Sequence, residues 1–183
     1  MAASYCDAVR KMEVTEVHKK YHDTEYGFPI LNDDALFGRL ILEINQAGLS
    51  WTTILNKKEN FFNAYHGFLI DKVAAYKDRD IQRLLNDAGI IRNRLKVAAA
   101  VENAKRIKVL QKQFGSFKAW LDHHHPQTKE SWVKTFKAHF KFTGGEIVNE
   151  FLMSTGYLPG AHIEGCPVYK KVMKQKPAWL FKR

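Results

Sequence analysis

The feature of this sequence that most constrains its fold is an apolar helical repeat in residues 33–44. Apolar side chains recur there every four residues, in two overlapping series formed by Leu36, Leu40 and Ile44 and by Phe37 and Ile41. This spacing places the side chains on one face of an α-helix. Asp33 and Asp34 are acidic residues of the kind that favour a helix start. The repeat therefore predicts a buried helix.

Apolar repeats elsewhere predict further helices and no strands. Ile81, Leu84 and Leu85 indicate a short helix after Lys72, a second, longer segment runs from about Ile91 to Gln113, and two more contain Trp132, Phe136 and Phe140 and then Ile147, Val148, Phe151 and Leu152. Alternating runs of Val, Ile and Thr, which are typical of strands, are missing. We expect an all-α fold, a single compact domain over residues 1–183, with a loop from Gly160 and a flexible basic tail over 170–183.

The charge of the chain favours a polyanionic partner. Lys and Arg total 29 against 19 Asp and Glu, for a formal charge of +10 and a pI near 9.6. Charge alone leaves two alternatives open, namely solubility and affinity for an acidic protein. No apolar run approaches the roughly 20 residues that span a bilayer, and the N-terminus lacks the regions of a secretory signal. We expect no membrane association and a cytoplasmic location.

Two cysteines at opposite ends of the chain suggest a metal site. His162 and Cys166 lie four residues apart in a Gly- and Pro-flanked segment, and Cys6 could join them with either His18 or His22. Two thiolates and two imidazoles form a typical tetrahedral set for structural zinc. Two free thiols remain the alternative. The neighbouring histidines at 123–125 are interpreted as part of a solvated loop.

Glu43 is a carboxylate on an apolar helical face. It shares the stripe of Leu36 and Leu40, where burial without a partner costs several kcal/mol or drives the acid to neutrality. The acid is therefore either paired with a basic residue of another helix or part of a functional site. The following residues 45–51 combine amides, a glycine, a leucine and Trp51, which suits the mouth of a pocket. Trp51 could equally be an ordinary core residue.

Residues 86–96 predict a helix, a glycine turn and a second helix. Arg92 and Arg94 are expected in the first turn of that second helix. The N–H groups at a helix start, together with these two side chains, suit a DNA phosphate. The alternative is an ordinary helical hairpin with a basic, solvated face.

Several motifs along the chain together resemble one protein family, the DNA-3-methyladenine glycosylase I family. These motifs are Tyr21–Gly27, Glu43 with Gln46–Trp51, Asp87–Arg92, Phe140–Phe142, and His162 with Cys166. They follow the order of the family along nearly the whole chain. The resemblance implies an all-helical member of the helix-hairpin-helix glycosylase superfamily. It also implies that the enzyme flips 3-methyladenine out of duplex DNA and hydrolyses its bond to deoxyribose.

The resemblance assigns roles to particular residues. It implies that Glu43 is the catalytic carboxylate, which hydrogen-bonds the extruded base. The residues around the base would be Tyr21, Tyr26, Gln46 and Trp51. The DNA contacts would come from Gly48, Leu49, Ala88, Gly89, Ile90, Arg92 and Arg94. One structural zinc ion would be held by Cys6, His22, His162 and Cys166.

The charge of the methylated base indicates which kind of reaction to expect. Adenine methylated at N3 carries a positive charge and is already a good leaving group. No clear lysine nucleophile lies in the hairpin turn, so we expect a monofunctional, monomeric glycosylase without lyase activity that leaves an abasic site and free 3-methyladenine. A zinc-stabilised DNA-binding protein without catalysis is the main alternative, but it has no use for Glu43.

The chain departs from the family at two aromatic positions. Many relatives have a tryptophan two residues after the first zinc cysteine, where this chain has Ala8. Tyr26 also stands where tryptophan is frequent. We therefore expect one wall of the base pocket to be built differently.

Overall fold

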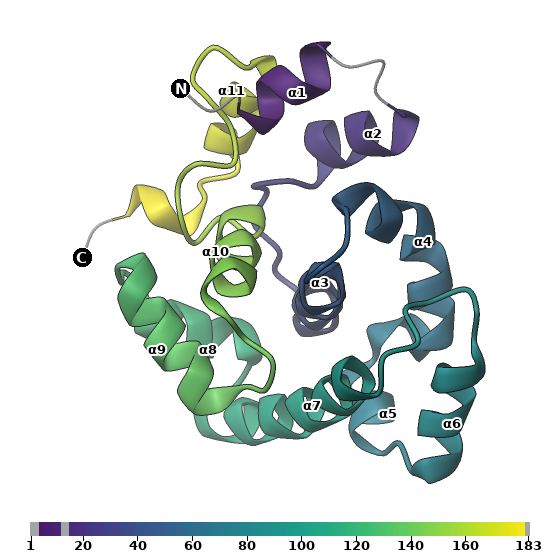
Figure 1. Ribbon diagram of the computed structural model, residues 1–183. Helices are drawn as coiled ribbons and strands as arrows, with labels where there is room; N and C mark the ends of the chain where they lie inside the picture. The colour runs from purple at the N-terminus through teal and green to yellow at the C-terminus, as the bar shows by residue number, and fades with distance from the viewer. Residues whose placement is uncertain (1–3, 12–14, 182–183) are drawn as a thin grey trace.

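The computed structural model describes residues 4–11 and 15–181, and all regular structure in these ranges is helical (Figure 1). The helices are α1 (Tyr5–Lys11), α2 (Glu16–Thr24), α3 (Asp33–Gln46), α4 (Trp51–Ala64), η1 (His66–Phe68), α5 (Ile70–Ala74), α6 (Asp78–Asn86), α7 (Arg94–Phe114), α8 (Phe117–His124), α9 (Lys129–His139), α10 (Gly145–Ser154), α11 (Pro167–Lys174) and η2 (Ala178–Leu180). This confirms the all-α prediction. None of these helices is long and apolar enough to cross a bilayer.

Helix α3, the predicted buried helix, lies at the centre of the main body. Figure 1 shows it nearly end-on, with α4, α7 and α10 around it, and it also contacts α5 and α8. The Asn32 side chain caps its start by accepting a hydrogen bond from the Ala35 amide. Its series Leu36, Leu40 and Ile44 is fully buried in the largest hydrophobic core. Burial on several sides means that any polar group on this helix lies deep in the protein.

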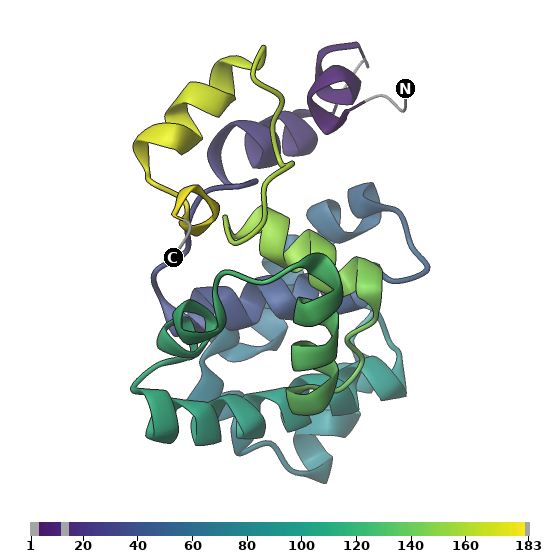
Figure 2. The same cartoon turned by 90° about the vertical axis from the view of Figure 1, so that its left-hand side faces the viewer.

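A smaller layer stands at one end of the main body. Helices α1, α2 and α11 lie together there, above α3 and α10 in the view of Figure 2. Cys6, Cys166, Val168 and Val172 form a separate buried cluster in this layer. Helices α1 and α11, which are far apart in the sequence, are therefore neighbours in space.

Three local predictions were wrong. The loop expected from Gly160 is present but ends at Cys166, because α11 begins at Pro167, whose position at the start of a helix costs no hydrogen bond. The expected flexible tail over 170–183 thus begins inside a helix, and residues 182–183 lie outside the described part. His123 and His124 end α8 instead of forming a loop. The second helix of the hairpin starts at Arg94, so Arg92 lies before it.

Candidate active site and metal cluster

A cavity of about 420 Å³ opens between the end layer and the main body. Its lining residues are Tyr5, Tyr21, Tyr26, Glu43, Gln46, Trp51, Glu146 and Glu150. All five residues that were expected around the base, including Glu43, are therefore brought together. They come from α2, the turn after it, α3 and the start of α4.

Glu43 is a buried acid whose carboxyl group is not part of any ion pair among the described residues. Its residue is 4% exposed. Burial raises the pKa of Glu43 to about 8, Glu150 adds to this rise, and Arg39 opposes it. The Arg39 guanidinium itself donates to the Tyr21 hydroxyl at 2.6 Å and to Glu25 at 3.2 Å. Glu43 thus lacks the salt bridge that was its alternative explanation, and below pH 8 it is mostly neutral.

Aromatic rings form the walls of this cavity. Tyr21 contacts Trp51 edge to face, with 5.2 Å between ring centroids, and lies 5.6 Å from the Tyr26 ring. Trp51 is the first residue of α4, directly after the capping Ser50, and it is only partly buried. Its ring is therefore not an ordinary core aromatic, because it packs on the core with one side and lines the cavity with the other.

Sequence reasoning missed three residues of the cavity: Tyr5, Glu146 and Glu150. The Tyr26 hydroxyl donates to Glu150 Oε2 at 3.2 Å, and burial raises the pKa of Glu150. Glu146 lies one helical turn away and pairs with Lys129 at 3.1 Å. The signal that could have found the two acids is their spacing of four residues beside the apolar face of α10. The cavity lining contains acids and aromatics but no Lys or Arg.

Gly48 and Leu49 lie in the exposed loop between α3 and α4. Gly48 has a φ of +80°, which favours glycine, and Leu49 is 38% exposed. The buried Lys96 Nζ donates to the backbone oxygens of Asn45 and Ala47 at 2.9 and 2.6 Å. This lysine of α7 binds the last carbonyls of α3 and so supports the start of the loop.

The hairpin between α6 and α7 differs in detail from the prediction. The Asn93 side chain accepts hydrogen bonds from the Leu95 and Lys96 amides, so these N–H groups are already used. The Gly89 amide is bonded to the side chain of Asp87. The expectation of unpaired amides at this helix start was therefore wrong for Leu95 and Lys96.

The side chains of the hairpin nevertheless leave a basic exposed surface. Ala88, Arg92 and Arg94 are exposed, whereas Ile90 is 3% exposed and belongs to the core. Lys57 of α4 donates to the carbonyls of Ala88 and Gly89 at 3.0 and 3.1 Å. These bonds hold the turn against α4, the helix that follows the loop with Leu49.

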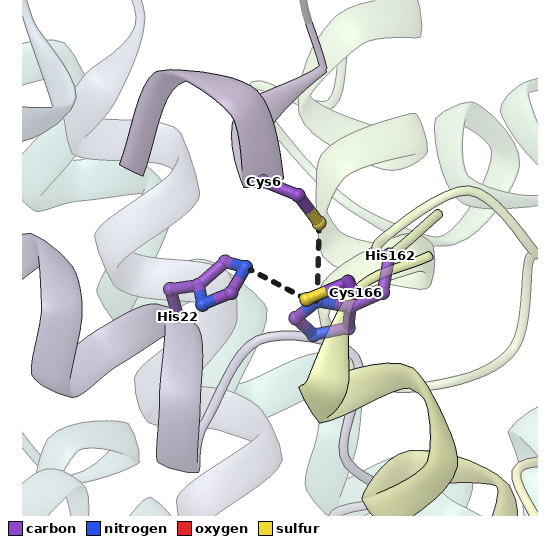
Figure 3. A group of neighbouring side chains, drawn as sticks. All are labelled: Cys6, His22, His162 and Cys166. Carbon is purple, nitrogen blue, oxygen red and sulfur yellow. Dashed lines mark hydrogen bonds between the residues drawn. The ribbon is translucent and has the colours of Figure 1, made fainter. Parts of the chain in front are cut away.

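The four predicted metal ligands converge in the end layer. Their side chains point toward one another in Figure 3, and their ligand atoms all lie within 4.8 Å of one another. Cys6 Sγ lies 3.5 Å from His162 Nδ1, and Cys166 Sγ lies 3.7 Å from His22 Nε2. Both cysteines are buried and free. The structure brings His22, not His18, into the group.

The geometry of this cluster fits a tetrahedral metal. Zinc bonds of about 2.3 Å to sulfur and 2.0–2.1 Å to nitrogen place neighbouring ligands about 3.6 Å apart. The outward-facing ring nitrogens are also held: His22 Nδ1 contacts Asp23 at 2.7 Å, and His162 Nε2 contacts the Tyr26 carbonyl at 2.7 Å. Such outer contacts orient metal-binding imidazoles. The cluster can hold a metal with four protein ligands, which leaves no position for a reacting water.

Comparison with known proteins identifies the family. The sequence profile of the family described as methyladenine glycosylase matches residues 11–169. DNA-3-methyladenine glycosylase 1 of Escherichia coli is 36% identical over 168 residues, which cover 81% of this chain and 89% of that protein. The Haemophilus influenzae DNA-3-methyladenine glycosylase is 33% identical, over 82% of this chain and 91% of that protein.

Solved structures agree with the sequence comparison. The fold matches 3-methyladenine DNA glycosylase I of Staphylococcus aureus with a TM-score of 0.80 and 32% identity, over 92% of this chain and 97% of that one. It also matches a single-residue variant of 3-methyladenine DNA glycosylase I in complex with 3-methyladenine, with a TM-score of 0.79 and 32% identity, over 84% and 92% of the two chains. The chain is thus an enzyme that belongs to the DNA-3-methyladenine glycosylase I family.

Proposed function

We propose that this enzyme removes 3-methyladenine from alkylated duplex DNA by hydrolysis, as a monofunctional glycosylase that leaves an abasic site. The observation that carries the proposal is the cavity around Glu43, which combines a buried acid without an ion pair and aromatic walls. A protein that only binds the DNA backbone needs no such pocket. We also propose that the enzyme acts as a monomer.

The chemistry of the pocket suits a cationic base. The faces of Tyr21, Tyr26 and Trp51 attract positive charge, and a carboxylate forms charge-assisted hydrogen bonds with it. A bound cation favours the ionised form of Glu43 and so lowers its pKa from about 8. Neutral adenine offers no such gain. Selection of the cation matters most, because methylation has already weakened the glycosidic bond that water then cleaves.

The duplex would be held beside this cavity. Flipping a nucleotide out of the duplex costs a few kcal/mol, less for a damaged base. We assign Gly48 and Leu49 to the gap that the base leaves, since the loop is exposed and lies next to Trp51. Arg92 and Arg94 suit backbone phosphates, with the turn at 88–90 supporting them. The net charge of +10 agrees with this partner.

We infer the absence of lyase activity from the position of Lys96. A lyase needs an amine that can reach the sugar of the flipped nucleotide. Lys96 is the buried lysine nearest in sequence to the hairpin, but its Nζ is bonded to the carbonyls of Asn45 and Ala47 at the end of α3. Among the residues that the structure describes, no lysine lines the cavity.

We assign one structural zinc ion to Cys6, His22, His162 and Cys166. Two thiolates neutralise the charge of the ion, and the four ligands join the first helix to the segment before α11. When bound, the ion supplies folding free energy and no chemistry.

Incubation with methylated duplex DNA tests the proposed function. The enzyme should release free 3-methyladenine and produce no strand cleavage beyond that of spontaneous abasic sites. Glu43→Gln should keep the fold and DNA affinity but lose about 100-fold or more in excision rate. Glu59→Gln, which changes an exposed acid of α4, is the matched control and should retain full rate. A well-folded enzyme that releases no 3-methyladenine would refute the function, and unchanged excision by Glu43→Gln would refute the role of the acid.

A further inference from the structure

Tyr5 is an aromatic residue of the cavity that neither the mechanism above nor the matched family region includes. It is the first residue of α1, and the family match begins only at residue 11. Its ring lies edge to face with Tyr26, at 5.3 Å between centroids and 83° between planes, and 6.4 Å from Tyr21. Tyr5 is half-buried, so part of its ring remains available to the cavity that it lines.

A chain of hydrogen bonds positions this ring. The Tyr5 hydroxyl lies 2.8 Å from His18 Nδ1, and His18 Nε2 lies 2.8 Å from Thr52 Oγ1. A neutral imidazole has one donor and one acceptor nitrogen, and each hydroxyl can either donate or accept, so both bonds can form at once. The chain joins α1 and α2 to the first turn of α4. Thr52 follows Trp51 in the sequence, so these hydrogen bonds link the Tyr5 wall of the cavity to its Trp51 wall.

The position of Tyr5 also provides an aromatic wall for the pocket in a chain that has Ala8 where many relatives have tryptophan. A methyl group at Ala8 cannot supply the aromatic wall that the family resemblance leads one to expect after the first cysteine. Tyr5, which directly precedes Cys6 in the sequence, is the residue of α1 that lines the cavity. Because Cys6 is fully buried in the four-ligand cluster, its neighbour Tyr5 has little freedom to move away.

We propose that Tyr5 is a specificity-determining residue whose ring closes the base pocket. Its hydroxyl is held by His18, which is held in turn by Thr52. This inference rests on the proposed function, since it assumes that the pocket binds a cationic purine. The ring adds a π surface for the cation and limits the width of the pocket. A narrower pocket favours 3-methyladenine over 7-methylguanine, which is also cationic in DNA but carries a further exocyclic group.

Two substitutions of Tyr5 test this role. Tyr5→Leu removes the ring while keeping bulk, and we expect its dissociation constant for free 3-methyladenine to rise about tenfold, which corresponds to about 1.4 kcal/mol. The ratio of kcat/KM for 3-methyladenine over 7-methylguanine should fall by a similar factor. Tyr5→Phe keeps the ring contacts but loses the hydroxyl, so a loss of about threefold is expected, as for Thr52→Val. The double variant Tyr5→Phe with Thr52→Val should lose no more than either one, because both break the same chain.

The matched control is Tyr169→Leu, which alters a partly buried aromatic beside Cys166, outside the cavity. Metal content and thermal stability are measured for every variant, since Tyr5 adjoins Cys6. If Tyr5→Leu loses its metal or does not fold, Tyr5→Phe and Thr52→Val still decide the question. Affinity and substrate ratio equal to wild type in the folded Tyr5 variants would overturn the proposal. Failure of the wild-type enzyme to release 3-methyladenine would instead overturn the proposed function.

Discussion

The metal cluster and the base pocket are two buried polar regions of the same end of the molecule, and they treat charge in opposite ways. In the cluster, each ligand has a partner: the four ligand atoms converge on one point, and both imidazoles have an outer contact. In the pocket, Glu43 is buried without an ion pair among the described residues. The nearby Glu150 makes ionisation of Glu43 still more costly in free energy. With the proposed ligands, a metal would complete the cluster and a cationic base would complete the pocket.

Tyr26 connects these two regions. Its backbone carbonyl contacts His162 Nε2 in the cluster, and its hydroxyl donates to Glu150 in the pocket. Closing the four ligands therefore also holds one wall of the pocket. The metal cluster would thus stabilise the fold around a pocket whose buried acid destabilises it. Active sites commonly need such compensation.

The largest expected effect comes from breaking the cluster. Cys166→Ser should lower the free energy of unfolding by about 4 kcal/mol or more, because an incomplete ligand set loses the metal and releases both ends of the chain. Urea unfolding with parallel metal analysis measures this. Chelation of the wild-type metal should reproduce the loss, and adding zinc should reverse it in wild type only. Equal stability with and without metal would show that the cluster is not a structural metal site.

The contribution of Glu43 to folding stability should change with pH in the opposite direction to that of an acid in a salt bridge. Folding raises the pKa of Glu43 to about 8, so the folded state binds its proton more tightly, and this contribution to stability is lost as pH rises from about 4.5 through 8. Glu43→Gln stays neutral, so it should be more stable than wild type by about 2–4 kcal/mol at pH 9, with little difference at pH 5. Unfolding curves at several pH values check this. A stability difference independent of pH, or one equal to that of Glu59→Gln, would contradict it.

A smaller effect is expected from the support of the loop beside the pocket. Lys96→Met removes the bonds to Asn45 and Ala47 and should cost about 1–3 kcal/mol of stability, because buried carbonyls lose their partner. The affinity for duplex DNA with an abasic site should also fall, since the loop with Leu49 is less well held. Lys105→Met, an exposed lysine of the same helix, is the control. Equal loss of affinity in both variants would indicate a general effect of charge.

The smallest expected effect concerns the second acid of the pocket. Glu150→Gln removes a negative charge near Glu43 and should lower the pKa of Glu43. If ionised Glu43 attracts the cationic base, kcat/KM rises with pH, and this rise should move to lower pH in the variant. Glu146→Gln is the matched control, because its carboxylate pairs with Lys129 and raises the pKa of Glu150, whereas Glu150 is the acid that raises the pKa of Glu43. A pH profile identical in wild type and Glu150→Gln would refute the coupling of the two acids.

Much of this site was predictable because it depends on local patterns. The apolar repeat of α3 places Glu43 on a buried face whatever packs against it, so an acid there demands an explanation. The amides, glycine and tryptophan after α3 belong to the same local signal. The resemblance to the family then selected His22 as a ligand, which the spacing of the histidines alone could not do.

The tertiary structure decided which groups meet across the chain. His18 and His22 lie one turn apart on α2, yet His18 hydrogen-bonds to Tyr5 and Thr52, whereas His22 joins the cluster. Arg39 lies one turn before Glu43 but pairs with Glu25, which only the return of the chain after α2 brings near. Glu150 and Tyr5 reach the pocket from opposite ends of the sequence. Periodicity determines which face of a helix is buried, but the partner on that face depends on the packing of segments that are distant in sequence.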